Sequence, residues 1–171
     1  MLLVLGVARV ITTDQHNTLP INQVEKKLAV SFSCREPELV LVGKRSHSSG
    51  GHIFRYADLL LVNPMNVPIE YKGYRMDSWQ TRPPVGEISP FYSLQIQTAE
   101  DKTWHNGSIG WCGTGAGKMT VPPKHVGRFA VHIDPRGTSA KISLKCSWTD
   151  SDGKRNEPEI VSQNLLGETE N

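Results

Sequence analysis

The chain has 171 residues, which is enough for one domain of ordinary size with a real hydrophobic core. Its 19 lysines and arginines nearly balance its 17 aspartates and glutamates, and no run of basic residues is longer than two. Nucleic-acid-binding domains carry a focused basic stripe that neutralises phosphates, so this composition argues against a nucleic-acid partner.

The N-terminal stretch MLLVLGVARVITTDQ is apolar for about a dozen residues. That is well short of the roughly 20 residues that span a bilayer, and no other segment is a better candidate, so we expect no membrane span. Two interpretations of the stretch stay open: an added β-strand, or the remnant of a signal peptide. The second favours an exported location (periplasm, envelope or extracellular space) over the cytoplasm. We therefore divide the chain into an extension at 1–24, a single domain at 25–166 and a frayed tail at 167–171.

The first half of the domain shows the two-residue alternation that is typical of strands. KLAVSFSC at 27–34 alternates apolar and small polar residues, which predicts a strand. ELVLVG at 38–43 is continuously apolar, as in a strand that is covered on both faces. SHSSGG at 46–51 predicts a flexible loop, and HIFRYADLLLVN at 52–63 predicts a long strand that ends at an Asn-Pro turn. A further alternating strand is expected at 67–74.

The second half repeats this pattern with longer interruptions. Residues 75–90 are rich in proline and should be irregular, 91–98 predict a strand, and 99–118 predict a loop. Strands follow at 128–133 and 141–148. In the latter, every second residue is apolar and the residues between are lysines and serines. Asp152-Gly153 then predicts a hairpin turn, with the returning strand at 158–166.

About eight short strands without a capped helical pattern predict an all-β fold. Because several strands are apolar on one face only, we expect a two-sheet sandwich of the immunoglobulin-like or fibronectin-III-like kind. The residue two positions before Cys146 is Leu144 rather than a corner tyrosine, and Cys34 and Cys146 are too far apart for an immunoglobulin-type bridge. The expected resemblance is therefore one of architecture alone.

The glycine-rich stretch GWCGTGAGKM at 110–119 resembles a phosphate-binding loop. A P-loop requires G-x-x-x-x-G-K-[ST] between a strand and a helix. Here Cys112 stands at the first glycine position and Met119 at the hydroxyl position, and Pro122-Pro123 prevents a following helix. We expect no nucleotide cofactor and interpret the stretch as an irregular loop.

Three tryptophans, Trp79, Trp104 and Trp111, fall in predicted loops. Exposed aromatic rings at the end of a sandwich can stack on a glycan or hold a protein partner, and tryptophan is enriched at binding hot spots. The alternative is that they close the open ends of the sandwich as core residues. These three residues are the candidate binding site, and the expected partner is a protein or a glycan.

The titratable residues give weaker signals. Cys112 is a candidate for a disulfide with Cys34 or Cys146, and Cys112 with His105 could form a thiol-dependent hydrolase site that lacks an orienting third residue. The histidines show no metal-ligand spacing, so no metal site is expected. Asn106-Gly107-Ser108 is an N-glycosylation sequon. Taken together, the sequence predicts a non-catalytic binding or interaction module, with a carbohydrate-binding module that uses the loop tryptophans as the alternative.

Overall fold

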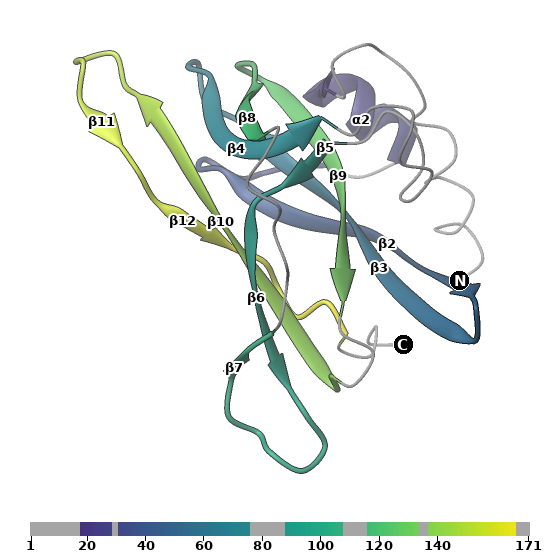
Figure 1. The fold of residues 1–171 in the computed structure, drawn as a ribbon. Helices are drawn as coiled ribbons and strands as arrows, with labels where there is room; N and C mark the ends of the chain where they lie inside the picture. The colour runs from purple at the N-terminus through teal and green to yellow at the C-terminus, as the bar shows by residue number, and fades with distance from the viewer. Residues whose placement is uncertain (1–17, 29–30, 76–87, 108–115, 134–136, 167–171) are drawn as a thin grey trace.

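The computed structural model describes residues 18–28, 31–75, 88–107, 116–133 and 137–166. Trp79, Trp111 and Cys112 lie outside these ranges. Within them the chain is mostly β, with one short helix and two antiparallel sheets, as an all-β sandwich requires (Figure 1). The general fold class predicted from the sequence is therefore confirmed.

The first sheet is built around three long antiparallel strands, which pair in the order β2, β3 and β9. The short strand β1 pairs with the start of β9. β5 lies between β4 and β9: it pairs with β4 in antiparallel fashion and with β9 through a single parallel bridge. β8 pairs with β4 along its whole length. The strands of this sheet are β1 (Thr18–Pro20), β2 (Glu38–Ser49), β3 (His52–Asn63), β4 (Ile69–Arg75), β5 (Ile88–Pro90), β8 (Ala116–Val121) and β9 (His125–Ile133).

The second sheet is smaller and is organised by the long strand β10. The short strand β7 extends it beyond β6. Its strands are β6 (Tyr92–Gln97), β7 (His105–Asn106), β10 (Ser139–Thr149) and β12 (Glu159–Val161), and β11 (Arg155–Asn156) pairs with the end of β10.

Strand β10 belongs to both sheets. Residues 139–144 pair with β6, whereas Cys146 and Ser147 pair with β4 of the first sheet. Lys145 therefore lies at the position where the partner on this edge changes. The alternation predicted for this strand is confirmed, because Ile142, Leu144 and Cys146 are buried in the core and the residues between them face outward. The two sheets consequently share one strand and one apolar core.

A helix covers the outer face of the first sheet, where the sequence pattern predicted a strand at 27–34. That prediction is wrong, because α2 (Ile21–Leu28) occupies its beginning and residues 31–34 form no regular structure. Ile21, Val24 and Leu28 recur at helical spacing, and Val24 is fully buried against β3 and β9. Residue 24, the expected end of the extension, lies inside this helix.

The apolar run of β2 and β3 is explained by this second layer. In β3, Leu59 and Leu61 face the core between the sheets, whereas Leu60 and Val62 face α2. The same division holds in β2, where Leu39 and Val40 point to opposite layers. The prediction that the segment at 38–43 is covered on both faces is confirmed.

Two predicted loops are shorter than the sequence suggested. β2 continues to Ser49 and β3 begins at His52, so Gly50 and Gly51 alone make the turn, with φ of +58° and +78°. Two positive φ values are typical of the type I′ hairpin turn, which glycine adopts without strain. The loop expected at 99–118 is interrupted by β7 and ends where β8 begins at Ala116. The second half of the glycine-rich stretch is therefore a strand that pairs with β4.

Candidate functional site

Trp104 is the one predicted binding tryptophan that the described residues include. It lies just before β7 and is half-buried, and the Lys141 ammonium sits 4.5 Å from the centre of its ring. A cation at this distance interacts favourably with the face of an indole ring. Lys141 thus already occupies one face of Trp104, and a binding role for this residue stays a prediction.

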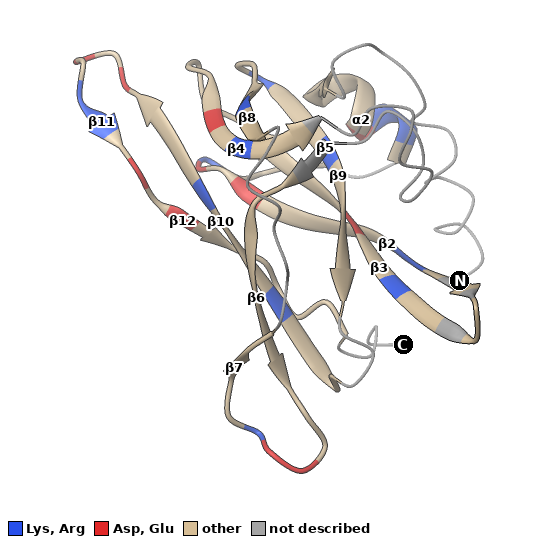
Figure 2. Ribbon diagram, in the orientation of Figure 1, with Lys and Arg blue, Asp and Glu red and all other residues tan. Residues whose placement is uncertain are grey.

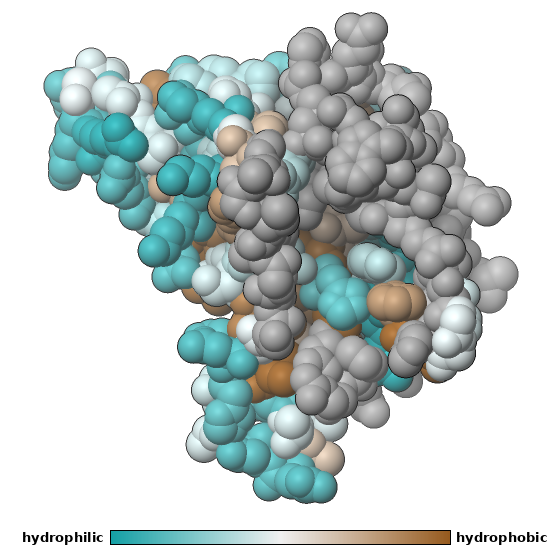
Figure 3. All heavy atoms as spheres, in the orientation of Figure 1, coloured by the Kyte–Doolittle hydropathy of each residue, from teal (hydrophilic) through white to brown (hydrophobic). Residues whose placement is uncertain are grey.

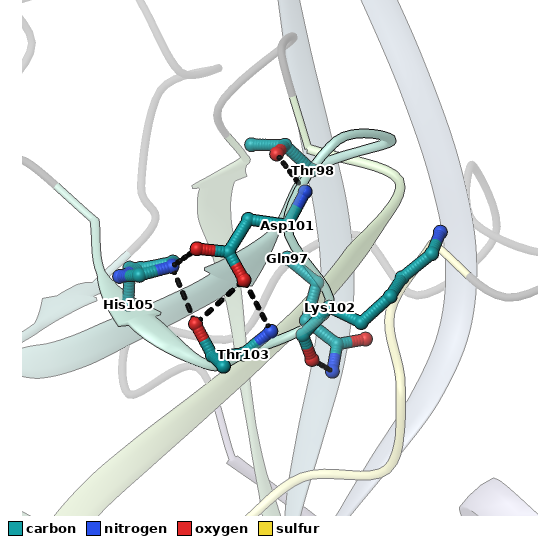
Figure 4. A network of polar contacts seen from close by, with 6 residues as sticks. All are labelled: Gln97, Thr98, Asp101, Lys102, Thr103 and His105. Atoms are coloured by element: carbon teal, nitrogen blue, oxygen red, sulfur yellow. Dashed lines mark hydrogen bonds and ion pairs between the residues drawn. The ribbon is translucent and has the colours of Figure 1, made fainter.

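His105 belongs to a network of exposed polar side chains in the loop between β6 and β7 (Figure 4). Its Nε2 lies 2.7 Å from Asp101 Oδ2 and 2.7 Å from Thr103 Oγ1, and Asp101 Oδ1 accepts hydrogen bonds from the amide and hydroxyl of Thr103. The hydrogen bonds from Thr103 and His105 lower the pKa of Asp101 to about 2.

The geometry of this network differs from that of a catalytic triad. In a triad the two ring nitrogens of the histidine contact different partners, one the nucleophile and the other the orienting carboxylate. Here a single nitrogen of His105 contacts both Thr103 and Asp101. We interpret the cluster as a set of hydrogen bonds that stabilises the loop. The Asp101 carbonyl also accepts a backbone hydrogen bond from the Thr98 amide.

The two described cysteines lie on opposite faces of the first sheet. Cys146 is buried in the core between the sheets, and burial raises its pKa to about 12. Cys34 packs at the edge of the cluster beneath α2, where burial and a hydrogen bond with Glu38 raise its pKa to about 11. Both are free thiols in the structure, and neither environment favours a reactive thiolate. Whether Cys112 forms a disulfide stays a prediction, because Cys112 is outside the described residues.

An open groove of about 1170 Å³ lies at the junction of the two sheets. It follows the place where β10 changes its partner from β6 to β4. Charged residues line it, and Figure 2 marks acidic and basic positions along β4, β8, β10 and the β11–β12 segment. Figure 3 shows the hydrophilic surface along the β11–β12 side of the groove. We call this feature the junction groove.

The floor of the junction groove is formed by small residues on the outward faces of the strands. Ser93 comes from β6, Ser143 and Ser147 from β10, and Ala116 and Gly117 from β8. Larger side chains at these outward positions would fill the space. Tyr71, Tyr92 and Cys146 also line it, although their side chains belong to the core.

Each of the three carboxylates of the junction groove has a partner, two of them in ion pairs and one in a hydrogen bond with a hydroxyl. Glu70 Oε1 lies 2.9 Å from Lys118 Nζ, and Glu157 Oε1 lies 2.7 Å from Arg155 Nε. Glu159 is directly opposite Lys145 across β10 and β12, but it accepts a 2.6 Å hydrogen bond from the Ser143 hydroxyl.

Two lysine side chains of the groove are not in such pairs. Among the residues that the structure describes, the ammonium groups of Lys72 and Lys145 have no hydrogen-bond or ion-pair partner. Lys72 is also directly opposite Lys118 across β4 and β8, and opposed like charges destabilise a sheet. The described lining of the junction groove thus has four cationic and three acidic side chains, a net charge of +1.

The sequence did place Lys72 and Lys145 on the polar faces of two strands, but it did not bring them together. They are far apart in the chain, and only the pairing of β4 with β10 places them in the same groove. Lys118, the lysine of the glycine-rich stretch, lines the same groove, where it is paired with Glu70. No sequence motif signals such a non-local arrangement.

The described segments contain no group of three or more histidine, cysteine or acidic residues that could hold a metal ion. In the same segments, no helix is long and apolar enough to cross a membrane. No known family model matches the sequence, and no curated protein matches it either. Since a β-sandwich supports many unrelated functions, the chemistry of the junction groove carries the functional conclusion.

Proposed function

We propose that the protein is a non-catalytic binding module that holds an anionic ligand in the junction groove. The observation that carries this proposal is the pair of ammonium groups on Lys72 and Lys145, which face the groove without a partner among the described residues. Two of its three carboxylates are already in ion pairs with other cations, and the third, Glu159, accepts a hydrogen bond from Ser143. Like charges held close together on a sheet cost free energy, and a bound anion would offset that cost.

Several features support a binding role over a catalytic one. The exposed histidine His105 uses one ring nitrogen for both of its partners, and burial raises the pKa of Cys146, the thiol that lines the groove. The surroundings of the groove are ammonium, carboxylate and hydroxyl groups on the rigid strands of two sheets, which suits recognition of a polar ligand. We further propose an immunoglobulin-like or fibronectin-III-like type for the sandwich, and an exported location, for which the apolar N-terminal stretch is the support.

The proposal is tested by replacing both unpaired lysines. At low ionic strength, heparin, polyphosphate or polyglutamate should raise the thermal midpoint of the wild-type chain, and K72A/K145A should abolish that rise. The matched control is K26A/K27A, which removes two exposed lysines from α2 and leaves the groove intact. Midpoints are read by differential scanning fluorimetry over a salt series, because screening by salt should weaken the effect.

Two outcomes would overturn the proposal. One is the absence of any stabilisation by all three polyanions. The other is an equal loss of stabilisation in K72A/K145A and K26A/K27A, which would show that only the net charge of the molecule matters. Circular dichroism of each variant without ligand checks that the sheets are retained.

A further inference from the structure

We propose that the anionic ligand is an acidic oligosaccharide, a chain of sugar rings that bear carboxylate or sulfate groups. This inference rests on the proposed function and adds the class of ligand. It is argued from the uncharged lining of the junction groove, which is what distinguishes a sugar from another polyanion.

The residue that is hydrogen-bonded to the backbone of Lys72 is aromatic. Phe91 lines the junction groove and is half-buried, and it makes a T-shaped contact with Tyr74, with the ring centres 4.8 Å apart. Its backbone amide donates a 2.9 Å hydrogen bond to the carbonyl of Lys72. This bond fixes Phe91 next to Lys72, so that a sugar ring stacked on the phenyl group could direct its acidic substituent toward the ammonium.

The hydroxyl groups of the floor supply the remaining polar contacts that a sugar needs. Among the described residues, the side-chain hydroxyls of Ser93 and Ser147 have no hydrogen-bond partner. A serine hydroxyl both donates and accepts hydrogen bonds, as sugar hydroxyls do. Glu159 adds a hydrogen-bond acceptor, which already accepts a bond from the Ser143 hydroxyl.

An acidic peptide fits the groove less well. Peptides that bind to sheets gain most of their affinity by adding a strand to a free edge. The two strands that form the centre of this groove have no free edge there, since β4 pairs with β8 on one side and with β5 and β10 on the other. β10 is likewise paired on both sides, with β4 and β6 on one edge and with β12 on the other. Recognition along β4 and β10 therefore uses side chains rather than an added strand.

The size of the groove favours an extended ligand. Sites for single small molecules have volumes of about 300–1,000 Å³ and enclose most of the ligand surface. The junction groove is open and measures about 1170 Å³. A single monosaccharide would leave most of it empty, whereas a chain of several sugar rings could follow it from Phe91 toward Arg155.

Isothermal titration calorimetry with four hexameric probes tests the inference on the 171-residue chain. Oligogalacturonate supplies carboxylated rings, a heparin hexasaccharide supplies sulfated rings, cellohexaose is the neutral sugar and hexaglutamate is the acidic peptide. We expect at least one acidic sugar to bind about tenfold or more tightly than cellohexaose, and K72A/K145A to remove that difference, whereas K26A/K27A retains it.

The variant F91L separates a sugar from a polyanion in general. Leucine keeps apolar packing against Tyr74 but lacks an aromatic face, so the affinity for the acidic sugar should fall about three- to tenfold, while any affinity for hexaglutamate should not change. If hexaglutamate binds through Lys72 and Lys145 as tightly as either acidic sugar, and F91L affects neither, the oligosaccharide inference fails and the anion-binding function stands. If no acidic probe responds to K72A/K145A, both fail.

Discussion

Tyr92 is the residue at which a single side chain connects the two sheets. Its hydroxyl accepts a 2.9 Å hydrogen bond from the His132 amide and donates a 3.3 Å bond to the His132 carbonyl. Tyr92 belongs to β6 and His132 to β9, so the phenol crosses the core to satisfy two backbone groups of the opposite sheet. Burial raises the pKa of Tyr92, which keeps the hydroxyl protonated and able to donate.

We predict that Y92F destabilises the protein by about 1–3 kcal/mol, because the phenyl ring is kept while its two partly buried hydrogen bonds with the backbone of His132 are lost. The matched control is Y71F. Tyr71 is similarly buried in the same core, but its hydroxyl has no hydrogen-bond partner among the described residues, so its removal should change stability by less than about 0.5 kcal/mol. Urea unfolding of both variants measures the difference, and equal losses would contradict a bridging role for Tyr92.

Among the elements, the β2–β3 hairpin depends on its two glycines. Space does not restrict them, because a Cβ atom added at Gly50 or Gly51 would meet no atom within 4 Å. The backbone does restrict them, since both have φ in the left-handed region. Asparagine tolerates the first position of a type I′ turn, whereas the second position strongly prefers glycine.

We therefore predict that G51A lowers the free energy of unfolding by about 1–2 kcal/mol, the cost of placing an ordinary residue in a left-handed conformation. G50N at the neighbouring position should be nearly neutral and is the control. Thermal unfolding followed by circular dichroism compares the two. Should G50N be as harmful as G51A, the turn would not be of type I′.

Strand β3 and helix α2 differ in how well the sequence predicts them. Strand β3 spans His52–Asn63, as its apolar run and its Asn-Pro boundary predict. Both signals are local, so they identify the strand in the sequence without knowledge of which strands pair with it. The helix α2 was missed for a physical reason. It has eight residues, too few for the repeated turns by which a helical period is recognised, and the alternation that follows Leu28 imitates a strand.

The junction groove could not be predicted from the sequence by the same reasoning. Alternation assigns Lys72 and Lys145 to polar faces, and in isolation this is what a solvated sheet shows. The two lysines line one groove only because of how the strands pair. The register of β4 and β10 places Glu70 opposite Ser147 and so brings the polar faces of the two strands together. Long-range pairing between strands is not encoded in any local period.

At the scale of the whole molecule, the shared strand β10 should make the two sheets unfold together. Leu144 is the last residue of β10 that pairs with β6 and also faces β12, and Cys146, the next inward residue, pairs with β4. Both side chains are buried in the one cluster that the sheets share. Loss of the second sheet would remove from the first sheet both a strand and half of its core.

We predict that the chain unfolds in urea in a single transition, with coincident midpoints by far-ultraviolet and near-ultraviolet circular dichroism. L144A, which truncates a fully buried side chain, should lower stability by about 2–5 kcal/mol and keep the two midpoints coincident. V161A is the matched control on β12, because Val161 is 55% exposed and its truncation should cost less than about 0.5 kcal/mol. Two separated transitions, in the wild type or in L144A, would mean that β10 does not couple the sheets, and the junction groove would then lose the rigid frame on which its recognition of a ligand depends.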